Sequence, residues 1–284
     1  MTQQPASASA RAQGVYAQSR RVVAGVVLAV IGFGAVFYPY AFFCLIFIIG
    51  AGCLYELSRL CERKGQPLEL PVALVGFAAY IALAAAGILH RYEGELLAGI
   101  VLATLGLGMY GTHSGYLART GYTLLGVLYI GKLLSYFVAI RALPVVGFNY
   151  TIYVIVIIAV TDIAAMLIGT SIGRTPLTRI SPQKTIEGSM GALAVAVLAA
   201  LCLAQTPLLH ILWWQAVVIG TITSLAAQAG DLVESALKRD ARVKDAGAAI
   251  AGHGGVLDRF DSYLFGGIAF YGALFLTGLL PFSE

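Results

Sequence analysis

Residues 149–169 read NYTIYVIVIIAVTDIAAMLIG, an apolar run in which Asp162 is the single charged side chain. A transmembrane helix needs about 20 predominantly apolar residues to cross the hydrocarbon core of a bilayer. An ionisable group within such a run is costly, which makes Asp162 a functional candidate. The stretch therefore predicts a membrane helix with polar chemistry near one of its ends.

Composition extends this interpretation to the whole chain. The 284 residues are 59% hydrophobic and only 11% charged, whereas an ordinary soluble domain is roughly 25% charged. Disordered chains are polar and highly charged, so that class is excluded too. We therefore expect an all-α, polytopic integral membrane protein with about nine transmembrane helices. The predicted spans are 22–38, 41–57, 71–89, 95–111, 122–141, 149–169, 190–206, 211–230 and 263–281.

The lysines and arginines predict the orientation of these spans. With a cytoplasmic N-terminus, fifteen of the eighteen basic residues fall in cytoplasmic segments. The exceptions are Arg91 and Arg141 outside, and Lys132 within a span. Cytoplasmic loops carry an excess of basic residues, so we expect a cytoplasmic N-terminus and an odd number of spans.

The aspartates divide the chain into two functional parts. None occurs before Asp162. We expect residues 1–150 to be a membrane scaffold of about five spans and residues 151–284 to be the catalytic membrane domain. Two cytoplasmic segments of that domain, 170–189 and 231–262, hold nearly all of its charged residues.

One helical face of the second segment carries both signs of charge. If the helix of 211–230 continues, then Asp231, Ser235, Lys238 and Arg242 are spaced at i, i+4, i+7 and i+11 and share a face. A carboxylate, a hydroxyl and two cations on one stripe suit a metal-bound polyphosphate. The alternative, a merely solvated loop, is disfavoured because acidic and basic residues alternate with glycines beside the membrane.

Further along, a glycine-rich turn precedes two more carboxylates. Residues 252–255 are Gly-His-Gly-Gly, and Asp258 and Asp261 follow. Glycines expose backbone N–H groups and let a phosphate approach closely. Aspartate oxygens favour Mg²⁺, which usually takes one or two carboxylates together with substrate phosphates. Carboxylates with lysines and arginines therefore indicate phosphoryl or nucleotidyl transfer.

Three motifs in this region carry a family resemblance. They are SALKR (235–239), KDAG (244–247) and GHGGVLDRFD (252–261). Together they resemble the signature of the phosphatidate cytidylyltransferases, also called CDP-diacylglycerol synthases. SPQKTIEG (181–188) resembles a second block of that family, and the resemblance covers roughly residues 155–280. Two departures are Gln183, where a second lysine is common, and Arg242, where a glycine often stands.

The resemblance implies a reaction in which CTP and phosphatidic acid give CDP-diacylglycerol and pyrophosphate. It implies Mg²⁺ as cofactor, with a second cation left open, and Asp231 and Asp258 as metal ligands. The candidate catalytic residues are Asp231, Asp258, Lys238, Asp162 and Asp261. The candidate residues for binding CTP or the lipid phosphate are Ser181, Lys184, Ser235, Arg239, Lys244, Asp245, His253, Gly254, Gly255 and Arg259.

The setting expected from the resemblance is the bacterial cytoplasmic (inner) membrane, with the active site on the cytoplasmic side, a homodimeric state and no nucleic-acid partner. One alternative keeps the chemistry and changes the acceptor to an isoprenoid-type lipid phosphate. Another is a transporter, which would place ionisable residues near the bilayer midplane and show inverted repeats. Most ionisable residues here lie instead at one predicted cytoplasmic edge, which disfavours the transporter.

Overall fold

A computed structural model of the chain describes residues 30–110, 115–206, 209, 211–243, 247 and 255–280. These residues contain helices and no β-strand, which confirms the all-α class for the described part. Residues 30–36 are helical. The helices that follow are α2 (Pro39–Arg63), α3 (Leu70–Ala85), α4 (Leu89–Gly108), α5 (Tyr116–Gly126), η1 (Val127–Lys132), α6 (Leu133–Ala142), α7 (Gly147–Ile172), α8 (Ile186–Ala204), α9 (Trp213–Asp240) and α10 (Leu257–Leu276).

Among the residues that the structure describes, five helices are long and apolar enough to cross a membrane. They are Pro39–Arg63, Tyr116–Ala142, Gly147–Ile172, Ile186–Ala204 and Trp213–Asp240. The second is continuous through α5, η1 and α6, with one π-helical stretch in its middle. Each span predicted from residue 41 onward overlaps a helix. Of the first predicted span, 22–29 lies outside the described residues.

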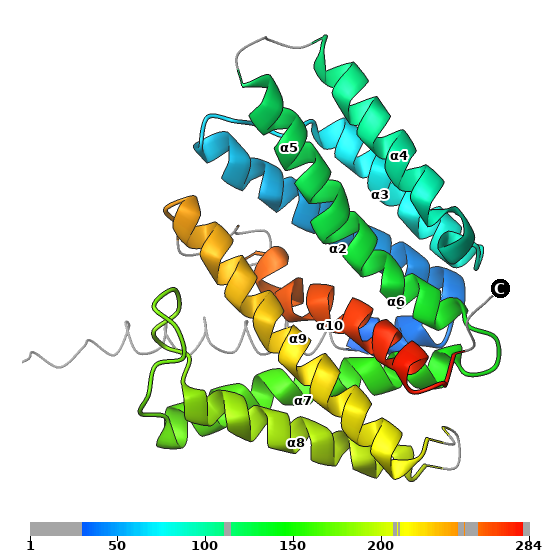
Figure 1. Ribbon diagram of the computed structural model, residues 1–284, viewed down its shortest axis with the longest axis vertical. Helices are drawn as coiled ribbons and strands as arrows, with labels where there is room; N and C mark the ends of the chain where they lie inside the picture. Colours follow the sequence, from blue (N-terminus) through cyan, green and yellow to red (C-terminus); the bar gives the residue numbers. More distant parts are fainter. Residues whose placement is uncertain are drawn as a thin grey trace, which may run out of the picture.

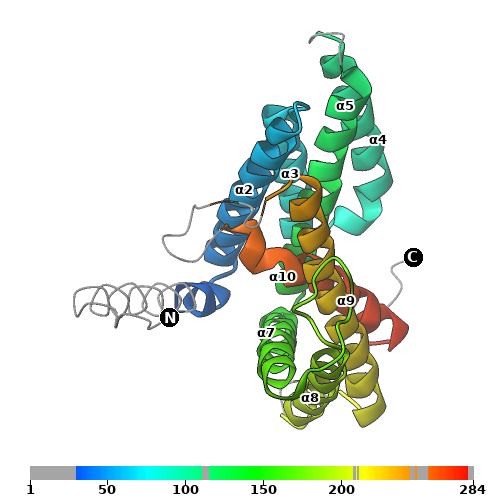
Figure 2. The same cartoon turned by 90° about the vertical axis from the view of Figure 1, so that its left-hand side faces the viewer.

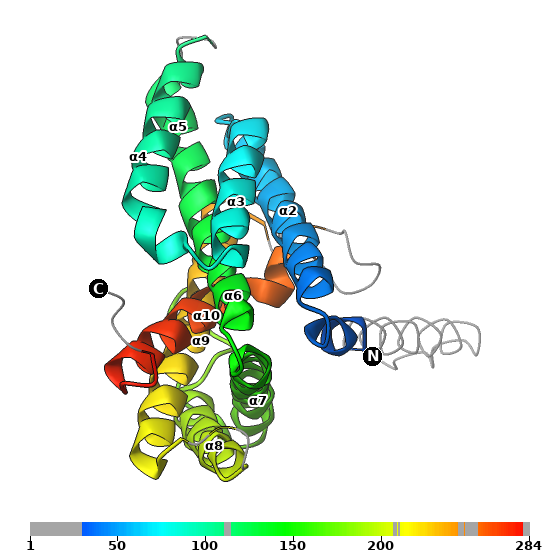
Figure 3. The same cartoon turned by 90° about the vertical axis from the view of Figure 1, so that its right-hand side faces the viewer.

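The helices form two groups that meet at α10. Figure 1 shows α2 to α6 on one side and α7, α8 and α9 on the other, and Figures 2 and 3 show α10 crossing between them. α10 packs most closely on α9, and it also contacts α6 and α2. The last helix therefore joins the N-terminal group to the C-terminal group.

Two glycines let helices approach closely beside the predicted site. A Cβ on Gly188 of α8 would lie 2.9 Å from the carbonyl oxygen of Ala165 on α7. A Cβ on Gly230 of α9 would overlap the carbonyl oxygen of Asp261 on α10. Neither position has room for a side chain. At Gly230, α9 and α10 therefore touch backbone to backbone, next to Asp231 and Asp261.

Helix α9 continues past Gly230, as the stripe of charged residues required, but it ends at Asp240. Arg242 follows with a φ of 57°, and the N–H of Val243 donates to the carbonyl of Lys238 over 2.9 Å. This is the left-handed termination that glycine adopts most readily. Arg242 is therefore off the helical stripe, in a conformation that suits the glycine expected at this position from the resemblance.

Candidate functional site

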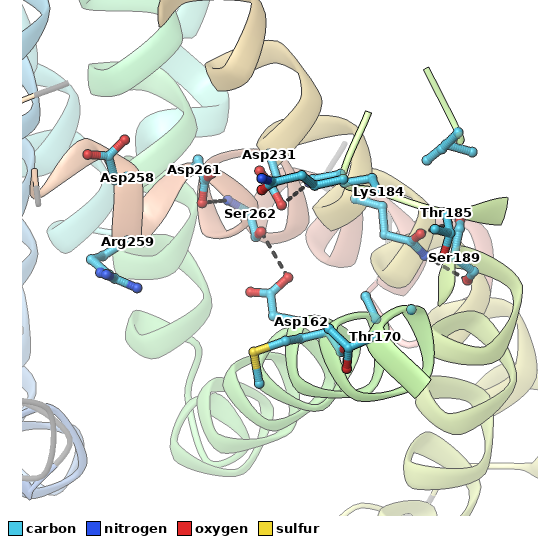
Figure 4. Close-up of a pocket in the computed structure, with 16 residues that line it drawn as sticks. Asp162, Thr170, Lys184, Thr185, Ser189, Asp231, Asp258, Arg259, Asp261 and Ser262 are labelled. Atoms are coloured by element: carbon cyan, nitrogen blue, oxygen red, sulfur yellow. Dashed lines mark hydrogen bonds and ion pairs between the residues drawn. The ribbon is translucent and has the colours of Figure 1, made fainter. Parts of the chain in front are cut away.

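A cavity of about 430 Å³ lies among α7, the 173–185 connection, α8, α9 and α10 (Figure 4). All of its lining residues belong to the predicted catalytic half of the chain. The sequence-predicted site residues among them are Asp162, Lys184, Asp231, Asp258, Arg259 and Asp261. Residues from two predicted cytoplasmic segments and from one predicted span thus share a single cavity.

The 173–185 connection is a folded loop that carries Lys184 into this cavity. The N–H of Leu177 donates to the carbonyl of Lys184 over 2.7 Å. Thr185 caps α8 by accepting the N–H of Gly188 at 3.1 Å. Glu187 accepts the N–H groups of Arg174 and Thr175 at 3.1 and 3.2 Å. The block at 181–188 therefore consists largely of residues that shape the loop and begin the next helix.

Two of the predicted carboxylates are connected through one serine. The Ser262 hydroxyl donates to Oδ1 of Asp162 over 3.0 Å, and the Ser262 N–H donates to Oδ1 of Asp261 over 2.7 Å. Asp162 belongs to α7, while Ser262 and Asp261 belong to α10 (Figure 4). The charged residue of the 149–169 span is thus held at the cavity wall by the other helix.

A group of three carboxylates lies where α9 meets α10. Oxygens of Asp231, Glu234 and Asp261 are all within 4.8 Å of one another. Glu234 is 1% exposed and Asp261 is 7% exposed. Lys184 forms an ion pair with Asp231. Carboxylates this close repel one another, and a cation bound among them would relieve the repulsion.

The fit of a divalent cation follows from the type of ligand atoms. Mg²⁺ is bound by oxygen ligands, and each of Asp231, Glu234 and Asp261 offers a carboxylate oxygen. Zinc sites are built mainly from cysteine and histidine, and neither residue type is among the described residues that line the cavity. The residues present therefore fit Mg²⁺.

Lys238 links this group to Asp258. Its Nζ is 2.6 Å from Oε2 of Glu234 and 2.7 Å from Oδ1 of Asp258. The N–H of Gly255 donates to the other Asp258 oxygen over 2.8 Å. Burial raises the pKa of Asp258, but its interactions with Glu234, with Lys238 and with the N–H of Gly255 outweigh burial and lower the pKa to about 2. Asp258 is therefore ionised at neutral pH, in the first turn of α10.

The remaining predicted site residues lie outside the group of Asp231, Glu234 and Asp261. Figure 4 shows Asp231 and Asp261 close together, with Asp258 and Arg259 apart from them, nearer to the start of α10. Ser181, Ser235 and Arg239 do not line the cavity, and Ser235 is only 9% exposed. Lys244, Asp245, His253 and Gly254 lie outside the described residues.

Glu234 and Ser262 are among the residues at the site that the sequence did not single out. Glu234 is three positions from Asp231 and four from Lys238, so helical spacing could have indicated it. Ser262 follows Asp261 directly, but nothing in its spacing indicated a bond to Asp162, which is 100 positions away.

Comparison with known proteins gives consistent matches. Residues 18–277 match the model of the cytidylyltransferase family. The phosphatidate cytidylyltransferase of Bacillus subtilis is 35% identical over 257 residues, which cover 87% of this chain and 93% of that protein. The phosphatidate cytidylyltransferase of a Synechocystis species is 39% identical over 197 residues, or 58% of this chain and 64% of that protein. The phosphatidate cytidylyltransferase of Staphylococcus aureus is 39% identical over 145 residues, which cover 51% of this chain and 55% of that protein.

Proposed function

The chain belongs to the cytidylyltransferase family, and we propose that it is a phosphatidate cytidylyltransferase. In the proposed reaction it converts CTP and phosphatidic acid into CDP-diacylglycerol and pyrophosphate, a step of phospholipid biosynthesis. The observation that carries the proposal is the single cavity that brings Asp162, Lys184, Asp231 and Asp261 together between membrane helices. Carboxylates and a lysine at one site suit a reaction between two polyanions, which repel each other unless cations intervene.

The proposed reaction is an in-line substitution at the α-phosphorus of CTP. An oxygen of the lipid phosphate forms the new P–O bond, and the bond to the bridging oxygen breaks, so that pyrophosphate leaves with the electron pair. No general base is required, because a phosphate monoester is already largely dianionic at neutral pH (second pKa about 6). Positioning and charge neutralisation supply most of the catalysis.

The residues of the chain take the following proposed roles. Asp231 and Asp258 would hold Mg²⁺. Asp261, Glu234 and Asp162 are the neighbouring carboxylates, and a second cation at the site is part of the proposal. The bound ion would neutralise charge on the phosphates.

Basic and hydroxyl side chains complete the proposed site. Lys184 and Arg259, both at the cavity wall, bind phosphates of CTP or of the lipid, and Lys238 keeps Asp258 in place through their ion pair. The remaining proposed substrate contacts are Ser181, Ser235, Arg239, Lys244, Asp245, His253, Gly254 and Gly255.

The proposed topology has nine spans, a cytoplasmic N-terminus and an active site facing the cytoplasm, in the bacterial inner membrane. The ends of α2, α4, α7 and α9 lie toward the upper and left side of Figure 1, and the starts of α3, α5 and α8 lie with them. Helix ends that alternate in this way support the proposal. We further propose that residues 1–150 form the scaffold and residues 151–284 the catalytic domain. The proposal also includes a homodimeric state and no nucleic-acid partner.

The test of function is an assay of the purified protein in detergent. We expect label from CTP to enter a lipid product, with release of pyrophosphate, when phosphatidic acid is the acceptor. An isoprenoid-type lipid phosphate and glycerol 3-phosphate are the comparison acceptors. Labelling of the isoprenoid acceptor alone would replace phosphatidic acid by the alternative substrate, and no labelling of any acceptor would contradict the proposed reaction.

Topology has its own prediction. Cysteines introduced at Gln66, Ala118 and Arg179 should react with a membrane-impermeant label only after the cytoplasmic side is opened. Cysteines at Tyr92 and at Asn149 should react in intact cells or spheroplasts, because Tyr92 lies just before the predicted span 95–111 and Asn149 at the start of the predicted span 149–169, both on the proposed outer side. Labelling of Gln66 and Arg179 on opposite sides of the membrane would rule out this arrangement.

A further inference from the structure

A buried carboxylate of the N-terminal half reaches the first turn of the last helix. Glu56 of α2 is 2% exposed. Its Oε1 accepts the N–H of Val256 at 2.9 Å, and its Oε2 accepts the N–H of Leu257 at 2.8 Å. α10 begins at Leu257, so one side chain from a distant part of the chain occupies two backbone donors at the start of this helix.

The first N–H groups of a helix have no partner within the helix. A carboxylate suits them, because it accepts charge-assisted hydrogen bonds and meets the positive end of the helix dipole. Glu56 lies on the buried side of α2 together with Cys53 and Leu57. Its two oxygens thus satisfy two backbone donors that would otherwise be buried without an acceptor.

The backbone around this carboxylate leaves no free space. A Cβ on Gly247 would overlap Oε1 of Glu56, and a Cβ on Gly255 would lie 2.5 Å from Oε2. One turn earlier on α2, a Cβ on Gly52 would lie 3.3 Å from a methyl group of Val256. Three glycines from two distant segments therefore surround one contact between α2 and the start of α10 (Figure 2).

This contact continues directly into the candidate site. The N–H of Gly255 donates to Asp258, and Asp258 pairs with Lys238. Three successive N–H groups, those of residues 255, 256 and 257, are thus held by two carboxylates. Asp258 is the second residue of α10 and Asp261 the fifth, so the position of the first turn decides where both carboxylates point.

We propose that Glu56 is a positioning residue of the active site: by holding the N–H groups of Val256 and Leu257 it places Asp258 and Asp261 for cation binding. The N-terminal helices then contribute to the site and are more than a scaffold. The kinetic part of this inference rests on the proposed function, whereas its structural and cation-binding parts do not.

The test compares variants of the full-length protein in detergent. Glu56→Gln keeps the size of the side chain, but its NH₂ group faces one of the two N–H donors and cannot accept. Glu62→Gln is the matched control, because Glu62 is on the same helix and forms an exposed pair with Arg59. Glu56→Asp keeps the negative charge and is the conservative variant. If Glu56→Gln does not fold, the same measurements are made on Glu56→Asp.

Three measurements give the readout. We expect Glu56→Gln to speed amide hydrogen exchange in the peptide that contains residues 256 and 257. We also expect it to raise the dissociation constant for Mn²⁺, measured by paramagnetic resonance, by about tenfold, the scale of one lost buried hydrogen bond. The value of kcat should fall by a similar factor while the KM for CTP at saturating Mn²⁺ stays within about twofold. Glu56→Asp should retain more of each property, and Glu62→Gln should match the wild type.

Two results would overturn the inference. Unchanged exchange at residues 256 and 257 would show that Glu56 does not hold them, and faster exchange with unchanged Mn²⁺ binding would show that it does not position the carboxylates. If the wild type failed to use phosphatidic acid, the proposed function would fall, but exchange and Mn²⁺ binding would still decide the role of Glu56.

Discussion

Asp231→Asn lowers kcat for CDP-diacylglycerol formation by at least about 100-fold, and Asp258→Asn does the same, if the two carboxylates share a cation. Asparagine keeps the size of the side chain but removes the charge that holds the metal. A loss of this size corresponds to about 2.7 kcal/mol, the scale seen when one preorganised electrostatic group is removed. The measurement is kcat of each purified variant, with membrane expression near that of the wild type as a check on folding.

The double variant and a nearby control make this result specific. Asp231→Asn combined with Asp258→Asn should be scarcely worse than either change alone, because residues that act as a unit are strongly non-additive. Asp240→Asn should cost little, since Asp240 pairs with Lys64 on the exposed side of α9. Simple multiplication of the two defects would contradict a shared cation. Normal turnover in Asp258→Asn, with loss in Asp261→Asn, would place the metal at Asp231, Glu234 and Asp261 instead.

Removal of divalent cations should abolish the activity completely. The reason is that both substrates are polyanions and that Asp231, Glu234 and Asp261 gather carboxylate oxygens at one place. Activity should return with Mg²⁺ or Mn²⁺, both of which favour oxygen ligands. The measurement is the rate of lipid labelling after treatment with a chelator and after titration with each cation. Full activity in metal-free buffer would show that charge is neutralised by the basic side chains alone.

Much of the fold could be predicted because the bilayer imposes a length and a polarity on each span. The runs from residue 41 onward all overlap helices, and five helices of the described residues are long and apolar enough to span a membrane. Asp162 stood out because a charge within an apolar run is costly, and the structure places it at the cavity wall. Helical spacing placed Asp231 and Lys238 on the same stripe, and α9 does continue through both.

The parts that could not be predicted depend on contacts between distant segments. Glu56 lies 201 positions before Leu257, and in the sequence it is one of several glutamates near predicted membrane boundaries. Arg242 fitted the helical spacing, but the helix ends two residues earlier in a left-handed turn. Spacing along one helix therefore identified residues that share a face. A hydrogen bond between two helices, such as that from Ser262 to Asp162, could be found only from the three-dimensional structure.

The bond between Glu56 and Leu257 also bears on how the protein is made. A ribosome adds about 5–20 residues per second, so the 201 positions that separate the two residues correspond to roughly 10–40 s of synthesis. During that interval α2 has been synthesised, but the two backbone donors for its Glu56 carboxylate have not. Because Asp258 and Asp261 belong to α10, the candidate site is complete only after this helix has been synthesised. A nascent chain that stops before Leu257 therefore has most of the cavity wall but lacks Asp258 and Asp261.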